Sequence, residues 1–273
     1  MTHHQLSQAI FSKQSYLCVG LDPDPEKLPQ SLTGSLAERI LAFNEQIIEA
    51  TKDFCVAYKP NTAFYESLGS DGWEVLQKTF QMIPRTHLAI ADAKRGDIGN
   101  TSRMYAKAFL EEMNADAITV APYMGADSVQ PFLDVANKWV IVLALTSNSG
   151  SQDFQTLKIG DSCLYEHVIK SVKLWGNANN TMLVVGATQA KEIGNVRKLV
   201  PDYFLLVPGV GAQGGSLAEV SAYGLTNTGG LLVNASRSIL YASSGDDWAA
   251  AAAEESQKLQ QKMAELLQKY CAK

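Results

Sequence analysis

The sequence has few cysteine and histidine residues, and their spacing excludes several kinds of site. The four cysteines are Cys18, Cys55, Cys163 and Cys271. They are scattered and form no C-x-x-C pair, so we expect reduced thiols in a cytoplasmic protein rather than disulfides or a zinc site. The histidines also lack the spacing of metal ligands, and His3 and His4 lie near a terminus that we expect to be mobile.

Long apolar runs and an excess of basic residues are also absent. No run approaches the roughly 20 residues that span a bilayer, so we expect no membrane segment. The first residues lack a basic segment followed by an apolar one, which argues against a secretory signal. The 23 basic and 28 acidic residues give a net charge of −5 without any basic stretch, so we expect no nucleic-acid partner.

The sequence does contain a regular alternation of apolar runs and helical patterns. The apolar runs, expected to be strands, span residues 16–21, 54–58, 88–91, 117–121, 140–145, 182–185, 203–207 and 230–233. The helical patterns span residues 36–51, 73–83, 103–113, 128–136, 163–175, 190–199, 216–223 and 246–270. This alternation predicts an α/β fold with a parallel sheet, and eight units predict a single (β/α)8 TIM barrel domain over residues 1–273. A doubly wound open sheet is the alternative, but no G-x-G-x-x-G follows the first run.

A cluster of charged residues follows the third apolar run. Asp92 and Lys94 are two positions apart, so a continuing strand would point both side chains to the same side. Arg95, Gly96 and Asp97 then have the composition of a turn. Charges at the end of a buried strand are costly unless they pair, so the cluster is either a structural ion-pair network or a catalytic one.

Polar residues follow most of the other predicted strands as well, and in a barrel these strand ends form the active site. The polar segments are 22–24, 59–61, 122–125, 146–148, 208–215 and 234–237. One hypothesis for Lys59 is a Schiff-base nucleophile. Nearby acidic residues would keep this lysine protonated, so the alternating charges favour proton delivery to a carbanion instead.

The segments after the last two strands have the composition of a phosphate site. Segment 208–215 contains four glycines, which let backbone N–H groups approach an anion, and Gln213 can donate from its amide. Arg237 can donate a bidentate pair of hydrogen bonds to phosphate oxygens. The alternative is a glycine-rich turn beside a surface arginine.

Two further segments have candidate binding roles. Asp22 can accept a hydrogen bond from a sugar hydroxyl, although Asp-Pro-Asp-Pro is also an ordinary turn sequence. Residues 146–148, with Ser147 at their centre, can bind a polar ring edge or simply form a turn. The Ser/Gly-rich stretch 148–157 is a candidate lid.

Together these segments resemble the orotidine 5'-phosphate decarboxylase family. The stretch 92–101, DAKRGDIGNT, matches the family's Asp-x-Lys-x-x-Asp motif. The supporting segments are GLDPD at 20–24, KPN at 59–61, PYMG at 122–125, LTSN at 145–148, PGVGAQGG at 208–215 and NASR at 234–237. They occur in the family's order over nearly the whole chain, and the chain length is similar to that of the longer bacterial-type branch.

The resemblance implies decarboxylation of orotidine 5'-phosphate to UMP and CO2, the last step of de novo UMP synthesis, without a metal or an organic cofactor. It implies a charged tetrad of Lys59, Asp92, Lys94 and Asp97. In this tetrad Lys94 would protonate C6 of the pyrimidine and Asp92 would lie beside the substrate carboxylate. Lys59 would hold Asp92 and a ribose hydroxyl.

The resemblance also implies binding roles and a homodimer. Asp22 would bind ribose, Ser147 would contact the pyrimidine edge, and Gln213 and Arg237 would hold the phosphate. By similarity, Asp97 and Thr101 would complete the site of the neighbouring subunit.

One departure from the family concerns the phosphate site, because Ser236 precedes Arg237 where the shorter branch has a glycine. Two other functions stay open beside the decarboxylase. Sugar-phosphate decarboxylases and hexulose phosphate synthases share the motif but need a metal, and the sequence offers no acidic metal cluster beyond the tetrad. A catalytically inactive nucleotide-binding barrel is the other, and the presence of both lysines and both aspartates argues against it.

Overall fold

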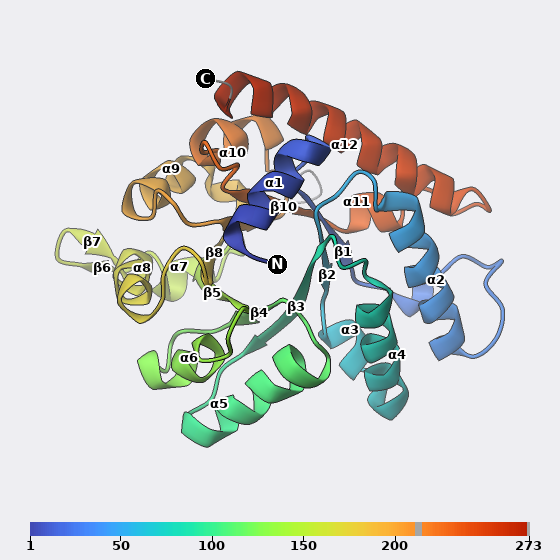
Figure 1. Cartoon of the computed structure of the whole chain (residues 1–273), viewed down its shortest axis with the longest axis horizontal. Helices are drawn as coiled ribbons and strands as arrows, with labels where there is room; N and C mark the ends of the chain where they lie inside the picture. Colours follow the sequence, from blue (N-terminus) through green and yellow to red (C-terminus); the bar gives the residue numbers. More distant parts are fainter. Residues whose placement is uncertain (211–214, 272–273) are drawn as a thin grey trace.

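Eight parallel strands close into a barrel in the computed structural model, which describes residues 1–210 and 215–271 (Figure 1). The strands are β1 (Leu17–Leu21), β2 (Ala57–Pro60), β3 (Leu88–Arg95), β4 (Ala117–Val120), β5 (Trp139–Leu145), β8 (Thr181–Val185), β9 (Leu205–Pro208) and β10 (Leu231–Ala235). Each strand pairs with its sequence neighbours within the barrel, and β1 closes it against β10. The predicted (β/α)8 fold is therefore confirmed.

Helices follow the strands and surround the barrel, as Figure 1 shows. The longer α-helices are α2 (Leu36–Thr51), α4 (Gly69–Met82), α5 (Gly99–Ala106), α6 (Ala126–Leu133), α8 (Leu164–Trp175), α9 (Ala190–Leu199), α10 (Leu217–Gly224) and α12 (Trp248–Cys271). Shorter pieces are η1 (Pro25–Lys27), α3 (Ala63–Glu66), the π-helix η2 (Lys107–Glu112), η3 (Ala187–Gln189) and α11 (Arg237–Leu240). The predicted closing helix is α12, which packs against α2 and α10.

The barrel strands are apolar because both of their faces are covered. Strands β1, β4 and β8 are buried along their whole length. Parallel strands enclosed by helices have this continuous apolar pattern rather than an alternating one. The apolar runs of the sequence therefore matched the strands, although β2 begins later than predicted and β3 continues through the charged residues to Arg95.

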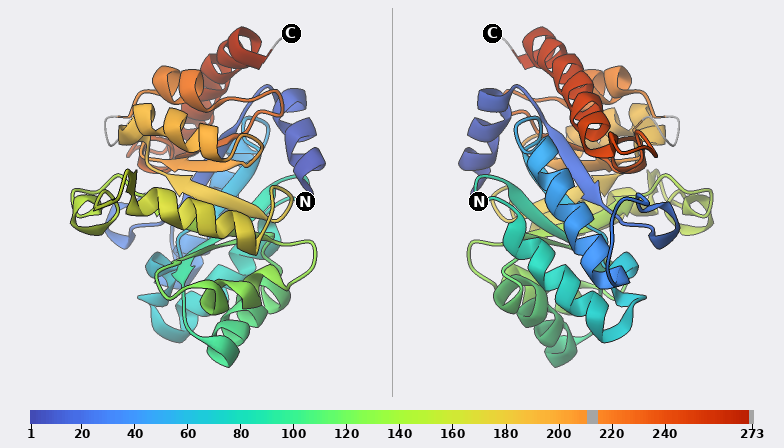
Figure 2. Two further views of the ribbon diagram at one scale, coloured as in Figure 1. Left: turned by 90° about the vertical axis from the view of Figure 1, so that its left-hand side faces the viewer. Right: turned by 90° about the vertical axis from the view of Figure 1, so that its right-hand side faces the viewer.

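The first residues form a helix, α1 (His3–Lys13), which lies across the end of the barrel where the strands begin (Figure 2). A capping box of Thr2 and Gln5 starts the helix, and Leu6 and Ile10 are fully buried beneath it. The expectation of a mobile terminus at His3 and His4 was therefore wrong. The helix has only two buried apolar positions, so its hydrophobic periodicity in the sequence is weak.

The connection between β5 and α8 carries the short helix α7 (Ser151–Phe154) and a hairpin of β6 (Lys158–Ile159) and β7 (Ser162–Cys163). Figure 2 shows this hairpin at the opposite end of the barrel from α1. The sequence had indicated a polar segment at 148–157 but not the hairpin. No helix within residues 1–210 and 215–271 is both long enough and apolar enough to cross a membrane.

Candidate active site

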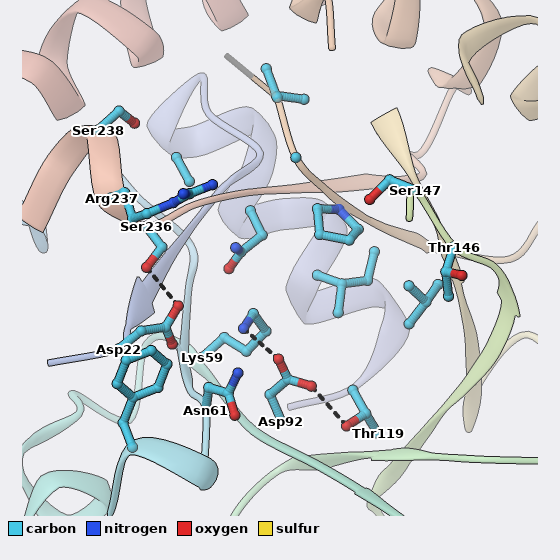
Figure 3. Close-up of a pocket in the computed structure, with 18 of the residues that line it drawn as sticks. Asp22, Lys59, Asn61, Asp92, Thr119, Thr146, Ser147, Ser236, Arg237 and Ser238 are labelled. Carbon is cyan, nitrogen blue, oxygen red and sulfur yellow. Dashed lines mark hydrogen bonds and ion pairs between the residues drawn. The ribbon is translucent and has the colours of Figure 1, made fainter. Parts of the chain in front are cut away.

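A cavity of about 600 Å³ opens where the barrel strands end, and Figure 3 shows part of its lining. The charged and polar lining residues come from separate strand ends, and they include Asp22, Lys59, Asp92, Lys94, Thr119, Ser147, Asn234 and Arg237. Leu143, Val184 and Leu206 form apolar parts of the same wall. Charges near such apolar surface interact more strongly than they do in water.

Asp92 lies between two ammonium groups. Its Oδ2 accepts a hydrogen bond from Lys59 Nζ at 2.7 Å, and its Oδ1 accepts one from Lys94 Nζ at 2.6 Å. The side chain of Lys59 is 5% exposed, whereas that of Lys94 is 49% exposed. One lysine is thus a buried partner of Asp92, and the other presents its ammonium to the cavity.

The charges of Asp92 and Lys59 stabilise each other's ionised forms. Burial alone would raise the pKa of the Asp92 carboxyl, but the charges of Lys59 and Lys94 outweigh it and hold that pKa well below its usual range. Burial would lower the pKa of Lys59, but Asp92 and Asp22 outweigh it and hold that pKa above the usual value. Lys59 is therefore an ammonium at neutral pH, which argues against the Schiff-base hypothesis because a nucleophilic lysine must be unprotonated.

Asp22 occupies the wall beside β10. Its Oδ2 accepts a hydrogen bond from the Ser236 hydroxyl at 2.6 Å, as Figure 3 shows, while its Oδ1 is buried and has no partner among residues 1–210 and 215–271. The Tyr241 hydroxyl donates to the Asp22 carbonyl at 3.1 Å and accepts from the Asp24 N–H at 2.6 Å. The turn after β1 is thus fixed by residues that follow β10, and Asp22 keeps one oxygen for a ligand.

The Asn234 side chain is a second polar group of the wall whose oxygen lacks a hydrogen-bond partner. The residue is 8% exposed, and its Oδ1 is buried and unpartnered among the described residues. Buried polar atoms are rarely left unpaired in folded proteins. Asp22 and Asn234 therefore provide two acceptors for a ligand that carries hydroxyl or amide hydrogens.

Arg237, Gly209 and Val210 line the same cavity as the lysines. Arg237 is the first residue of α11 and is exposed, so its guanidinium is accessible to an anion. Gly209 has a φ of 92°, a conformation that favours glycine and turns the chain at the end of β9. Arg237 and the turn at Gly209 therefore lie in the wall of the same cavity.

Thr146, Ser147 and Asn148 lie together at the end of β5 and line the cavity. The Thr146 hydroxyl donates to Asn148 Oδ1 at 2.6 Å, and Gln155 accepts from the Thr146 N–H at 2.7 Å. These bonds tie Asn148 and Gln155, which lie near the two ends of the 148–157 segment, to the end of β5. Ser147 therefore lies at the edge of the cavity where β5 ends.

A family model described as orotidine 5'-phosphate decarboxylase / HUMPS family matches residues 15–253. The chain belongs to this family. A relative from Christiangramia forsetii named orotidine 5'-phosphate decarboxylase is 55% identical and covers 98% of this chain and 100% of its own. One from Flavobacterium johnsoniae with the same name is 56% identical and covers 98% of both. The solved structure of Leishmania donovani OMP decarboxylase is 38% identical with a TM-score of 0.82, and it covers 97% of this chain and 100% of that one.

Membership of the orotidine 5'-phosphate decarboxylase / HUMPS family confirms the resemblance drawn from the motifs. Within the described part of this single chain, Asp97 and Thr101 are absent from the cavity lining. Asp97 lies on the turn after β3, where its Oδ1 accepts from the Ile98 N–H at 2.8 Å, and Thr101 is exposed on α5. Gln213 lies outside the described residues.

The sequence did not predict the contacts that the side chains of Arg95 and Thr119 make. Arg95 points away from the cavity, forms an ion pair with Glu66 and lies over the ring of Tyr105. Thr119 donates a hydrogen bond to Asp92 Oδ1 at 3.0 Å. A threonine in the short buried strand β4 was the available signal, because a buried hydroxyl needs a partner.

Within residues 1–210 and 215–271, no three His, Cys, Asp or Glu side chains lie close enough to hold a metal ion. The described site therefore offers ammonium groups, a guanidinium and hydrogen-bonding groups for its chemistry.

Proposed function

We propose that this chain decarboxylates orotidine 5'-phosphate to UMP and CO2, the last step of de novo UMP synthesis, using neither a metal nor an organic cofactor. The observation that carries the proposal is the ionised Asp92 held between the ammonium groups of Lys59 and Lys94 at the wall of the cavity. The relatives named for this activity support the substrate. We further propose one barrel domain over residues 1–273.

The reaction breaks the bond between C6 of the pyrimidine and the carboxylate carbon, and the electron pair remains on C6. No cofactor ring accepts this pair in our mechanism, so the protein must stabilise the charge with a preorganised cation. The Lys94 ammonium is partly exposed to the cavity and fits this role. It donates its proton to C6 and is then reprotonated from solvent.

Asp92 and Lys59 prepare the site for this step. In our mechanism the Asp92 carboxylate lies beside the substrate carboxylate, so their repulsion is relieved when CO2 leaves. The buried Lys59 ammonium keeps Asp92 ionised and also reaches a ribose hydroxyl. Asp22, with its unpartnered Oδ1, accepts from the ribose.

The remaining contacts hold the two ends of the nucleotide. Arg237 and Gln213 bind the phosphate, and Ser147 contacts the pyrimidine edge. Phosphate binding is remote from C6, so its free energy can order the site and close the 148–157 segment over the ring.

We propose that the active form is a homodimer in which Asp97 and Thr101 complete the partner's site. Four large apolar side chains near these residues are highly exposed in the single chain: Ile98 at 60%, Met104 at 50%, Tyr123 at 87% and Met124 at 47%. Gly96 packs close to Met124, which links the loop after β3 to the loop after β4. Exposed apolar groups gathered in one region are typical of a protein interface.

The cytoplasm is the compartment we propose for this enzyme. All four cysteines are free thiols in the structure. Thiols stay reduced in the cytoplasm, whereas oxidising compartments favour disulfides.

The proposed activity is tested by incubating purified protein with orotidine 5'-phosphate in excess EDTA and measuring CO2 release. We expect full activity in EDTA and its loss in Lys94→Ala, because this substitution removes the proton donor. Lys262→Ala, which changes an exposed lysine of α12, is the matched control and should behave as wild type.

Two other outcomes would change the assignment. A folded wild-type protein that releases no CO2 would overturn the proposed function. Activity that EDTA abolishes and Mg²⁺ restores would move the chain to the metal-dependent sugar-phosphate enzymes.

A further inference from the structure

Strand β3 departs from regular pairing where the charged residues begin. Its pairing with β4 is regular up to Ala91 and resumes at Arg95, and Thr119 is the one residue of β4 in between. Lys94 has a φ of 47°, a backbone conformation that residues other than glycine rarely adopt. Regular sheet geometry therefore does not set the direction of Asp92 and Lys94, and another group must hold them.

Thr119 makes both of the contacts that this irregular stretch needs. Its Oγ1 accepts a hydrogen bond from the Lys94 N–H at 2.9 Å and donates one to Asp92 Oδ1 at 3.0 Å (Figure 3 shows the second). A hydroxyl can donate one bond and accept two, so a single atom satisfies both groups. Thr119 is 1% exposed, so water does not compete freely for these bonds.

The contacts form a closed loop of three bonds. Asp92 Oδ1 also accepts from Lys94 Nζ at 2.6 Å, so the hydroxyl of Thr119 fixes the backbone of Lys94 while the carboxylate fixes its ammonium. Holding a reacting group in place can contribute strongly to a rate, because a displacement of 1 Å can lower it about 100-fold. The hydroxyl thus lies where it can control the placement of the proton donor.

We propose that Thr119 is a positioning residue that sets the geometry of the Asp92–Lys94 pair. This inference rests on the proposed decarboxylation. Thr119 acts through Lys94 and Asp92, and its loss affects the chemical step more than substrate binding. The alternative is a buried threonine that only stabilises the fold.

Three variants separate these roles. Thr119→Val keeps the branched shape and removes the hydroxyl, Thr119→Ser keeps the hydroxyl, and Thr181→Val is the matched control. Thr181 is fully buried but begins β8, at the end of the barrel away from the cavity. For Thr119→Val we expect kcat to fall about 10- to 100-fold with KM changed less than about threefold.

The serine variant should recover kcat to within about threefold of wild type, and Thr181→Val should leave kcat unchanged. Hydrogen exchange gives a second readout that does not require activity. The Lys94 amide should exchange faster in Thr119→Val than in wild type, whereas amides of β8 should not.

Several outcomes would overturn the inference. If Thr119→Val has the wild-type kcat and an unchanged hydrogen-exchange rate at the Lys94 amide, Thr119 only stabilises the fold. Equal losses of kcat in the valine and serine variants would exclude the hydroxyl as the cause. Absence of turnover in the wild type would instead remove the proposed function and this role with it.

Discussion

At the scale of single residues, the site depends on burying a charge that its neighbours compensate. Asp92 and Lys59 have side chains that are 10% and 5% exposed, and their ion pair is 2.7 Å long. A buried pair adds little net stability relative to apolar residues, but removal of one partner leaves an uncompensated charge. This asymmetry distinguishes Lys59 from a surface lysine.

We predict that Lys59→Met lowers the free energy of unfolding at pH 7 by about 3 kcal/mol, near the low end for a broken buried pair because Lys94 still contacts Asp92. The pKa of Asp92 rises in the variant because one of the two charges that lower it is gone. The loss of unfolding free energy relative to wild type is therefore complete above this new pKa and becomes smaller as the pH falls through it. Urea unfolding at several pH values measures both effects.

The matched control is Lys78→Met, which breaks an exposed pair with Glu74 on α4. Exposed pairs contribute about 0 to 1 kcal/mol, so this variant should remain close to wild type. The double variant Lys59→Met/Asp92→Asn should recover part of the lost stability. A deficit below about 1 kcal/mol for Lys59→Met would contradict the prediction.

At the scale of elements, the end of α1 is joined to the segments that precede β2 and β3 by the half-buried Lys13 and the buried His87. Lys13 Nζ donates to the carbonyls of Lys52 and Cys55 at 2.6 and 2.9 Å and lies 2.7 Å from His87 Nε2. His87 Nε2 also lies 2.8 Å from the Lys52 carbonyl, so whether this nitrogen donates or accepts depends on the tautomer of the ring. Burial, followed by the charge of Lys13, lowers the pKa of His87 to about 4.

We predict that this histidine makes the protein less stable as the pH falls. The unfolded histidine binds a proton near pH 6.5, whereas the folded one resists it down to about pH 4. Between these values the unfolded state binds more protons, so the free energy of unfolding decreases with acidification by at most about 1.4 kcal/mol per pH unit. Denaturant unfolding from pH 8 to pH 4 measures this slope.

The slope of His87→Gln should be smaller than that of wild type across this pH range. The exposed His4→Gln is the matched control and should keep the wild-type slope. Identical slopes in all three proteins would mean that His87 has the same pKa in the folded and the unfolded state.

At the scale of the whole molecule, the proposed site requires two chains. Lys94 and Asp92 would act in the cavity of their own chain, whereas Asp97 would act in the cavity of its partner. A C2 dimer of this kind has two equivalent sites, each built from both subunits. Variants that damage different contributions to a site can therefore complement one another.

We predict that Lys94→Ala and Asp97→Ala are each inactive as homodimers and recover activity when mixed by refolding. Half of the random dimers contain both variants, and each mixed dimer has one intact site, so about a quarter of wild-type activity returns. CO2 release after mixing measures it. Lys94→Ala mixed with Asp92→Ala is the control, because both changes affect the same chain's contribution and no intact site forms.

No recovery from the first mixture, in protein that forms mixed dimers, would contradict a shared site. Recovery in the control mixture would mean that the returning activity does not come from sites shared between two subunits.

The amino-acid sequence by itself predicted the barrel and most of the candidate site residues that line its cavity. Buried parallel strands are apolar throughout and end in polar residues, so both the positions of the strands and the cluster at Asp92 and Lys94 are local features of the chain. The distinctive spacing of the charged motif also identified the family. Helix α1 was missed because only Leu6 and Ile10 are buried in it, which gives a weak periodic signal.

Only the tertiary structure decided how the charged residues are held. Ser236 bonds Asp22 across 214 positions of the chain, and Thr119 bonds Asp92 across 27. The bulge in β3 gives Lys94 a backbone conformation that its side chain does not favour. Such contacts depend on the closure of the barrel and on the register of neighbouring strands. Neither of these can be predicted from a local pattern of residues.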